Sequence, residues 1–113
     1  MSARVLAASV IFVTMPLSST VYANPSPPAF DPANYSNGNG LTRAKAIVLL
    51  SRSEAGGVAS EASWVAHFYP RSKVVHQVLT TWDEGKRYDI LTVETSAMHK
   101  IILWFDVTLI FKD

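Results

Sequence analysis

The spacing of apolar residues changes along this chain, from a repeat of about 3.6 residues before Pro70 to a repeat of about two after it. The stretch 74–82 (VVHQVLTTW) alternates two sets of side chains and is rich in β-branched residues, which is typical of a strand. The stretches 87–95 and 100–107 follow the same pattern. Because short turns separate the three, with Gly85 suited to a positive φ in the first turn, we expect an antiparallel meander.

Before Pro70 the pattern favours two helices. Helical spacing begins after Thr42, a suitable N-cap, and ends at Gly56 and Gly57, which offer the left-handed position that terminates a helix. A second helix is expected over about 58–68, because the residue before Pro70 is pushed out of the helical region. A three-stranded sheet must bury one face, and only these helices can cover it. The predicted fold is therefore α+β, with two N-terminal helices packed on a three-stranded antiparallel meander sheet.

Residues 1–23 show the three parts of a secretory signal peptide. Arg4 supplies the positive start, 5–17 is an uncharged and mostly apolar run, and small residues precede Ala23. This run is too short and too interrupted to span a membrane well. We predict cleavage after Ala23 and a mature protein in the periplasm or the medium, without a membrane anchor. An uncleaved anchor and a buried N-terminal helix are the alternatives.

The segment 24–40 (NPSPPAFDPANYSNGNG), which we call the leader, is rich in residues that interrupt helices and strands. It is interpreted either as a flexible connection or as an ordered loop that Phe30 and Tyr35 attach to the body. A chain of this length holds one domain at most, so residues 41–113 are expected to form a single α+β domain.

Charge and cysteine content exclude several classes of function. The chain has ten Lys and Arg against nine Asp and Glu. Cleavage would remove one cation, Arg4, and leave a formally neutral mature part, which gives no electrostatic reason to expect nucleic acid as a partner. There is no cysteine, which excludes disulfides, cysteine-ligated metals, thiol nucleophiles and a lipidated cysteine. No glycine loop suited to phosphate is present, and no cofactor is predicted.

Candidate catalytic residues are few. Three histidines lie on different expected elements and lack the spacing of metal ligands, so no metal site is predicted: His67, His76 and His99. Asp89 and Asp106 lie on neighbouring expected strands and would form an acid–base pair if the register placed them on one face. Ordinary pairing with cations across the strands is the competing interpretation. A small hydrolase or metal-assisted enzyme that uses Asp89, Asp106 and the histidines is the alternative function.

Aromatic and apolar residues of the last strand suggest a binding surface. Every second residue from Ile101 is suited to the buried face, which leaves Ile102 and Trp104 on the other face. Together with Trp82 they form an apolar patch of the kind that marks interaction sites. The leading prediction is a non-enzymatic binding module that contacts an unknown protein partner through Trp82, Ile102 and Trp104, with no catalytic residue assigned. A leader folded over this face and homodimerisation through the sheet are the alternatives.

Residues 72–107 resemble the PepSY-type module, in which a helix precedes strands joined by hairpins. The segments 88–93 (YDILTV) and 104–107 (WFDV) match its strands, and 41–50 takes the place of its first helix. The chain lacks the glycine expected after the last aspartate and has 96–99 (SAMH) in place of an Asp-Gly hairpin. Similar domains occur in outer-membrane assembly lipoproteins and in secreted inhibitors of β-lactamases. The resemblance implies a non-enzymatic exported module, either one that restrains a hydrolase or an envelope accessory protein.

Overall fold

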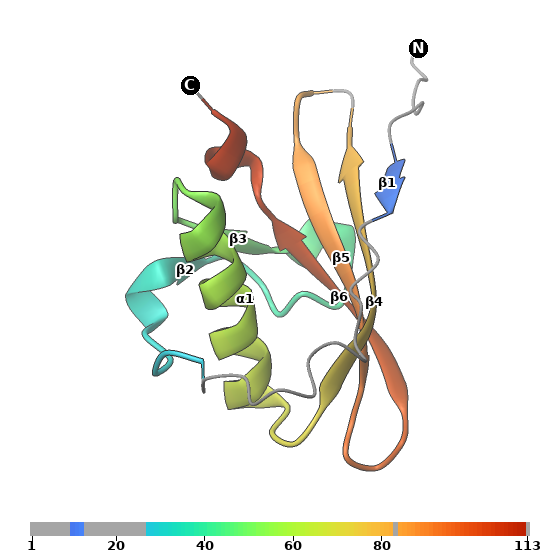
Figure 1. Cartoon of the computed structure of the whole chain (residues 1–113). Coiled ribbons are helices and arrows are strands. Elements are labelled where there is room, and N and C mark those ends of the chain that lie inside the picture. The colour runs from blue at the N-terminus through green and yellow to red at the C-terminus, as the bar shows by residue number, and fades with distance from the viewer. Residues whose placement is uncertain (1–9, 13–26, 83, 113) are drawn as a thin grey trace.

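One α-helix packs on one side of a mixed sheet in the computed structural model, which describes residues 10–12, 27–82 and 84–112 (Figure 1). The sheet runs in the order β1-β4-β5-β6-β3-β2; β3 and β6 are parallel, and the other neighbouring strands are antiparallel. The helix is α1 (Glu54–Phe68), and the strands are β1 (Val10–Phe12), β2 (Tyr35–Ser36), β3 (Ile47–Leu49), β4 (Lys73–Thr81), β5 (Arg87–Glu94) and β6 (Lys100–Asp106). Short 3-10 turns are η3 (Pro32–Asn34), η4 (Arg43–Lys45) and η5 (Thr108–Phe111).

This arrangement contradicts the predicted fold of two helices on a three-stranded antiparallel sheet. The first expected helix is instead the turn η4 followed by β3, which lies between β6 and β2. Ile47 and Leu49 are almost completely buried there. A short apolar run that is buried as a central strand has the same sequence pattern as a buried helix segment, and only its length separates the two.

The glycines expected to end that helix lie inside α1. The helix begins after Ser53, whose Oγ accepts a hydrogen bond from the Gly56 amide at 3.0 Å. A side chain on Gly57 would collide with that of Ile110 in η5. This glycine is therefore explained by the close approach of the C-terminal turn to the helix, and not by helix termination.

The three strands predicted after Pro70 are present as β4, β5 and β6, joined by two hairpins. Gly85 has the expected positive φ of 80° in the first hairpin. The register places Leu79 of β4 and Phe105 of β6 on either side of Asp89 in β5. These three side chains face α1, and alternate residues face the opposite side of the sheet.

The core lies between the C-terminal half of α1 and the centre of the sheet. The Trp64 ring packs edge-on against Phe105, with ring centroids 5.7 Å apart. Most of the surrounding side chains are apolar, and several exclude water completely: Ile47, Leu49, Val93, Leu103 and Phe105. This packing fixes the helix against the sheet at one end.

The described part of the leader is ordered: it contains η3 and the edge strand β2, and its aromatic side chains contact α1. Phe30 stacks on His67 with ring centroids 4.1 Å apart, and the Tyr35 hydroxyl donates to the Ser60 carbonyl at 2.7 Å. The predicted signal peptide and its cleavage site after Ala23 lie outside the described residues, apart from Val10–Phe12, which pair with β4 as β1. Within the described ranges, no helix has the length and apolar character needed to cross a membrane.

Candidate functional site

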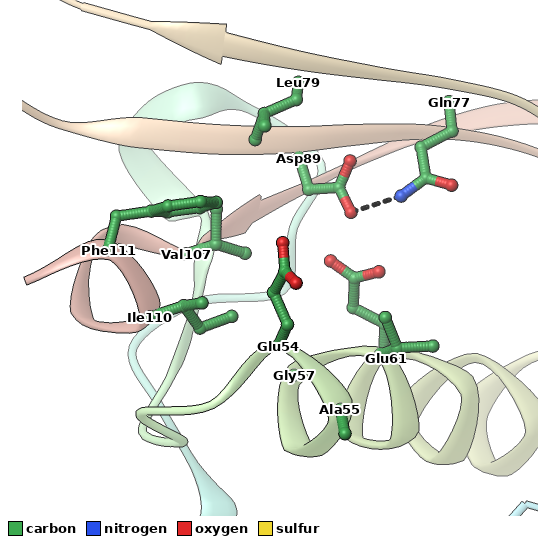
Figure 2. Close-up of a pocket in the computed structure, with 11 residues that line it drawn as sticks. Glu54, Ala55, Gly57, Glu61, Gln77, Leu79, Asp89, Val107, Ile110 and Phe111 are labelled. Atoms are coloured by element: carbon green, nitrogen blue, oxygen red, sulfur yellow. Dashed lines mark hydrogen bonds between the residues drawn. The ribbon is translucent and has the colours of Figure 1, made fainter. Parts of the chain in front are cut away.

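A groove of about 680 Å³ lies where the N-terminal half of α1 meets β4, β5 and η5 (Figure 2). Four polar residues line it: Glu54, Glu61, Gln77 and Asp89. The other lining residues are apolar or glycine: Ala55, Gly57, Val58, Leu79, Val107, Ile110 and Phe111. We call this site the acidic groove.

The polar residues reach the groove because of where they stand in α1 and the sheet. Glu54 and Glu61 are two helical turns apart and therefore share a face of α1. Asp89 lies on the helix-facing side of β5, and Gln77 of β4 lies two residues before Leu79, the residue paired with Asp89, so it shares that face. Figure 2 shows the two glutamates reaching from the helix toward the sheet, and Gln77 and Asp89 reaching from the sheet toward the helix.

Glu61 and Asp89 form a buried carboxyl pair. Each residue exposes only 7% of its surface. Gln77 Nε2 donates a hydrogen bond to Asp89 Oδ2 at 2.5 Å, which orients the aspartate. The other oxygen, Asp89 Oδ1, is buried without a hydrogen-bond partner among the described residues. Burial removes the hydrogen bonds that this oxygen would make to water, and no protein donor replaces them. Such unsatisfied buried acceptors are rare in folded proteins.

Burial raises the pKa of Glu61 well above its usual range, and the neighbouring Asp89 raises it further. While Glu61 holds its proton, the pair carries at most one negative charge. Paired carboxyls that hold one proton are a recurring feature of functional sites, because like charges in contact cannot both ionise easily.

The charges around the pair leave the groove negative. Glu54 is exposed at the mouth of the groove. The Arg87 guanidinium stacks on the Phe111 ring, 4.5 Å from its centroid. Among the described residues, no three histidine or acidic side chains are arranged to hold a metal ion. The groove thus combines carboxyl groups with apolar walls.

The structure places the predicted catalytic residues apart. Asp89 lies opposite Phe105 and Asp106 lies opposite Tyr88, so the two aspartates are on different faces of the sheet. Asp106 is an ordinary structural carboxylate: its Oδ2 lies 3.3 Å from Lys86 Nζ, and its Oδ1 accepts hydrogen bonds from Thr108.

The histidines are equally dispersed. His67 lies on α1 against Phe30, His76 lies on β4, and His99 follows the turn between β5 and β6. None of the three lines the acidic groove. The carboxyl group that neighbours Asp89 is instead Glu61 of α1, which none of the sequence patterns indicated. The available signal was a carboxylate next to Trp64 and Val65 on the apolar side of a helix.

The three residues of the predicted binding surface lie together on the face of the sheet that points away from α1, which we call the open face. Ile102 is 48% exposed, Trp82 is 38% exposed and Trp104 is half-buried. The Tyr88 ring packs edge-on against both tryptophans, and the Arg43 guanidinium lies 4.2 Å from the centroid of the Trp82 ring. The described contacts of the leader aromatics are on the helix side, so Phe30 and Tyr35 do not cover this face.

Comparison of the chain with protein-family models, with curated proteins and with solved structures gives no match. A proposal about function therefore depends on the chemistry of the acidic groove and of the open face. A fold by itself would be a weak guide in any case, since one architecture serves many activities.

Proposed function

We propose that this protein is an exported, non-enzymatic binding module that holds a small, mainly apolar molecule in the acidic groove. The observation that carries the proposal is a groove of about 680 Å³ whose apolar walls surround a buried carboxyl pair. Pockets for small ligands have volumes of roughly 300–1,000 Å³ and combine apolar walls with a few polar groups. The acidic groove has both properties.

Stability alone does not account for the pair. Removing a carboxylate from water costs free energy, and apolar residues of similar volume stabilise a buried position at least as well. Glu61 and Asp89 lie beside the apolar side chains of Leu79 and Val107, where such residues would fit. Their presence is better explained by a ligand than by packing.

The lining of the groove favours binding over catalysis. No serine, histidine or lysine is among the lining residues, so a nucleophile next to a base is missing from that set.

Fragment binding followed by amide NMR tests this proposal. Small apolar amines, alcohols and acids would be titrated into the protein, and we expect the largest shift changes in the N-terminal half of α1, in β4, in β5 and in η5. The variant Val58→Trp would fill the groove from an exposed position and abolish these changes. The matched control Ala66→Trp lies at an exposed position farther along α1 and should leave them intact. Shift changes confined to other surfaces, or none at all, would refute the proposal.

A second candidate function is a protein partner bound on the open face. It is favoured by the exposure of Ile102 and Trp82 around Tyr88 and by the position of the leader on the other side. The PepSY-type resemblance agrees with this class of function. Ile102→Asp should abolish capture of a partner from a periplasmic extract, whereas Ala62→Asp, at an exposed site on α1, should not. If Ile102→Asp instead separates a dimer of this chain, the partner is a second copy.

Export is part of the same proposal, and it depends on residues 1–23. Expression with the native N-terminus followed by cell fractionation should recover the protein outside the cytoplasm. N-terminal sequencing of the recovered protein should begin at Asn24. A cytoplasmic protein that retains Met1 would contradict export and leave the acidic groove as a separate question.

A further inference from the structure

We propose that the acidic groove binds a primary alkylammonium ion between the buried carboxyl groups of Glu61 and Asp89. This inference rests on the proposed function of the groove and names the chemical class of its ligand. It stands on three observations: a buried carboxyl pair, an aspartate oxygen without a partner, and apolar walls on the same cavity.

The first argument is charge balance. When Glu61 holds a proton, the pair of Glu61 and Asp89 carries at most a single negative charge. If that proton leaves for the solvent and an ammonium group enters, two carboxylates and one cation again sum to one negative charge. The buried site therefore keeps its net charge through the exchange, which avoids the large cost of burying a second uncompensated charge. An anionic ligand would have to add charge to the groove, and a neutral ligand would leave the proton in place.

The second argument is the match of donors to acceptors. An ammonium group has three donors and no acceptor. Asp89 Oδ1 is buried without a partner, while Asp89 Oδ2 accepts from Gln77 Nε2 and so holds the aspartate in one orientation. Glu61, once it has released the proton, presents only acceptors. Two carboxylates facing each other across the groove thus offer acceptors to every ammonium donor, and a charge-assisted hydrogen bond to Oδ1 would satisfy the partnerless oxygen.

The third argument is the shape of the walls. Leu79 and Val107 line the groove from the sheet side, and Ile110 and Phe111 line it from η5 (Figure 2). These side chains offer an apolar surface to a hydrocarbon body attached to the ammonium group. Inorganic cations gain nothing from such a surface, whereas each methylene of an alkyl chain does. The ligand class is therefore an amine with an apolar body and not a metal ion.

The affinity for the ligand should depend on pH through the proton held by the pair, and few other charged groups among the described residues lie near it. From α1, Glu54 adds a negative charge at the exposed mouth. From β4 the neighbour is the neutral Gln77, and from β5 it is Arg87, whose guanidinium is stacked on Phe111. The residues of η5 carry no titratable side chain, and Lys112 just beyond it is exposed. Because one proton leaves for each ligand bound, the affinity should rise about tenfold per pH unit while the pair still holds its proton.

Isothermal titration calorimetry with hexylammonium chloride tests the exchange. The full chain would be titrated near neutral pH in two buffers of different ionisation enthalpy, phosphate and MOPS, neither of which contains a primary amine. We expect the measured enthalpies to differ by the amount that corresponds to release of about one proton per ligand. We expect 1-hexanol, which has the same body without the charge, to bind at least tenfold more weakly. Hexylammonium binding with no dependence on the buffer would overturn the inference and leave the proposed function intact.

Variants separate the exchange from simple attraction between charges. Glu61→Gln has the shape of a protonated Glu61, so it should bind hexylammonium without releasing a proton, and the buffer dependence should vanish. The double change of Glu61→Gln with Asp89→Asn should lose binding, while its far-UV circular dichroism stays that of the parent. The matched control Glu94→Gln, at the far end of β5 beside Lys73, should behave like the parent.

Two further outcomes show whether only the ammonium inference fails or the proposed function fails as well. If 1-hexanol binds as well as hexylammonium, the groove is an apolar site, and the ammonium inference fails while the proposed function holds. If neither molecule binds and the fragment titrations also leave the groove unchanged, both the inference and the proposed function fail.

Discussion

The two halves of α1 meet the same sheet in different ways. The C-terminal half inserts Trp64 against Phe105, and apolar side chains fill the space between helix and sheet. The N-terminal half leaves the acidic groove, in which Glu61 faces Asp89 across a partly empty space (Figure 2). One end of the interface is held by packed aromatic and aliphatic side chains, and the other contains the acidic groove of about 680 Å³.

The difference follows from the side chains that each half presents. Aromatic rings fill the first contact, whereas the second has two carboxylates and the small residues Ala55 and Gly57. Ile110 of η5 comes close to Gly57, and this contact forms one end of the groove without filling it. We infer that the aromatic end contributes most of the free energy of unfolding. The acidic end can therefore retain polar groups that lower the stability of the fold. The following substitutions test that division.

The largest effect is expected at the aromatic end. Trp64→Ala removes a ring that packs on Phe105, Phe68 and Tyr69, and it leaves a cavity in the core. We expect the free energy of unfolding to fall by about 3–5 kcal/mol in urea denaturation. A loss below about 1 kcal/mol would show that the aromatic half does not hold the fold together.

The next effect has the opposite sign. Glu61→Gln removes the buried ionisable group from the acidic end and keeps its shape, so we expect the free energy of unfolding at pH 8 to rise by roughly 1–3 kcal/mol. Urea denaturation at that pH measures it, with Glu94→Gln as the control. A destabilised Glu61→Gln protein would mean that the carboxyl pair supports the fold.

The same residue sets a pH dependence. The folded-state pKa of Glu61 is raised above its unfolded value, so the folded state binds the extra proton between the two values. The stabilising contribution of Glu61 is therefore complete below its unfolded pKa of about 4.3 and is lost as the pH rises through the folded pKa. The stability difference between the parent and Glu61→Gln should grow with pH across that window. A difference that is constant with pH would contradict the assignment.

A smaller effect is expected at the wall of the groove. Phe111→Ala removes a half-buried ring and the surface on which Arg87 stacks. We expect thermal unfolding to report a loss of about 1 kcal/mol, because the ring borders an open space and does not fill a closed core. A loss above about 3 kcal/mol would place Phe111 in the structural core and not at a ligand site.

The smallest effect is expected on the open face. Ile102→Thr exposes no cavity and removes an apolar side chain that is already half in water. Its free energy of unfolding should stay within about 0.5 kcal/mol of the parent value. A larger loss would show that this face is covered in the folded protein and is not available to a partner.

Local signals explain which parts of this fold the sequence could predict. The alternation in β4, β5 and β6, the positive φ at Gly85 and the opposite directions of Leu103 and Trp104 follow from strand geometry alone. The strand β3 was missed because a buried strand of three residues has no pattern of its own, and its parallel partner β6 is more than fifty residues away.

The candidate site was harder to predict than the strands. Asp89 was recognised as a carboxylate of interest but was paired with Asp106, since neighbouring strands were the only contacts that the sequence suggested. Its actual partner, Glu61, comes from a helix packed across the sheet, and the shape of the groove depends on η5 at the other end of the chain. Such contacts are set by tertiary packing and have no local sequence signature.

The central claim is that burial and the neighbouring Asp89 raise the pKa of Glu61 in the acidic groove. The most direct measurement is a ¹³C NMR titration that follows the side-chain carboxyl of Glu61 in the folded protein. The account expects Glu61 to titrate well above the usual glutamate value of about 4.3, and it expects Asp89→Asn to move that titration downward, because Asp89 contributes to the shift. A Glu61 carboxyl that titrates in the ordinary range and does not respond to Asp89→Asn would contradict it.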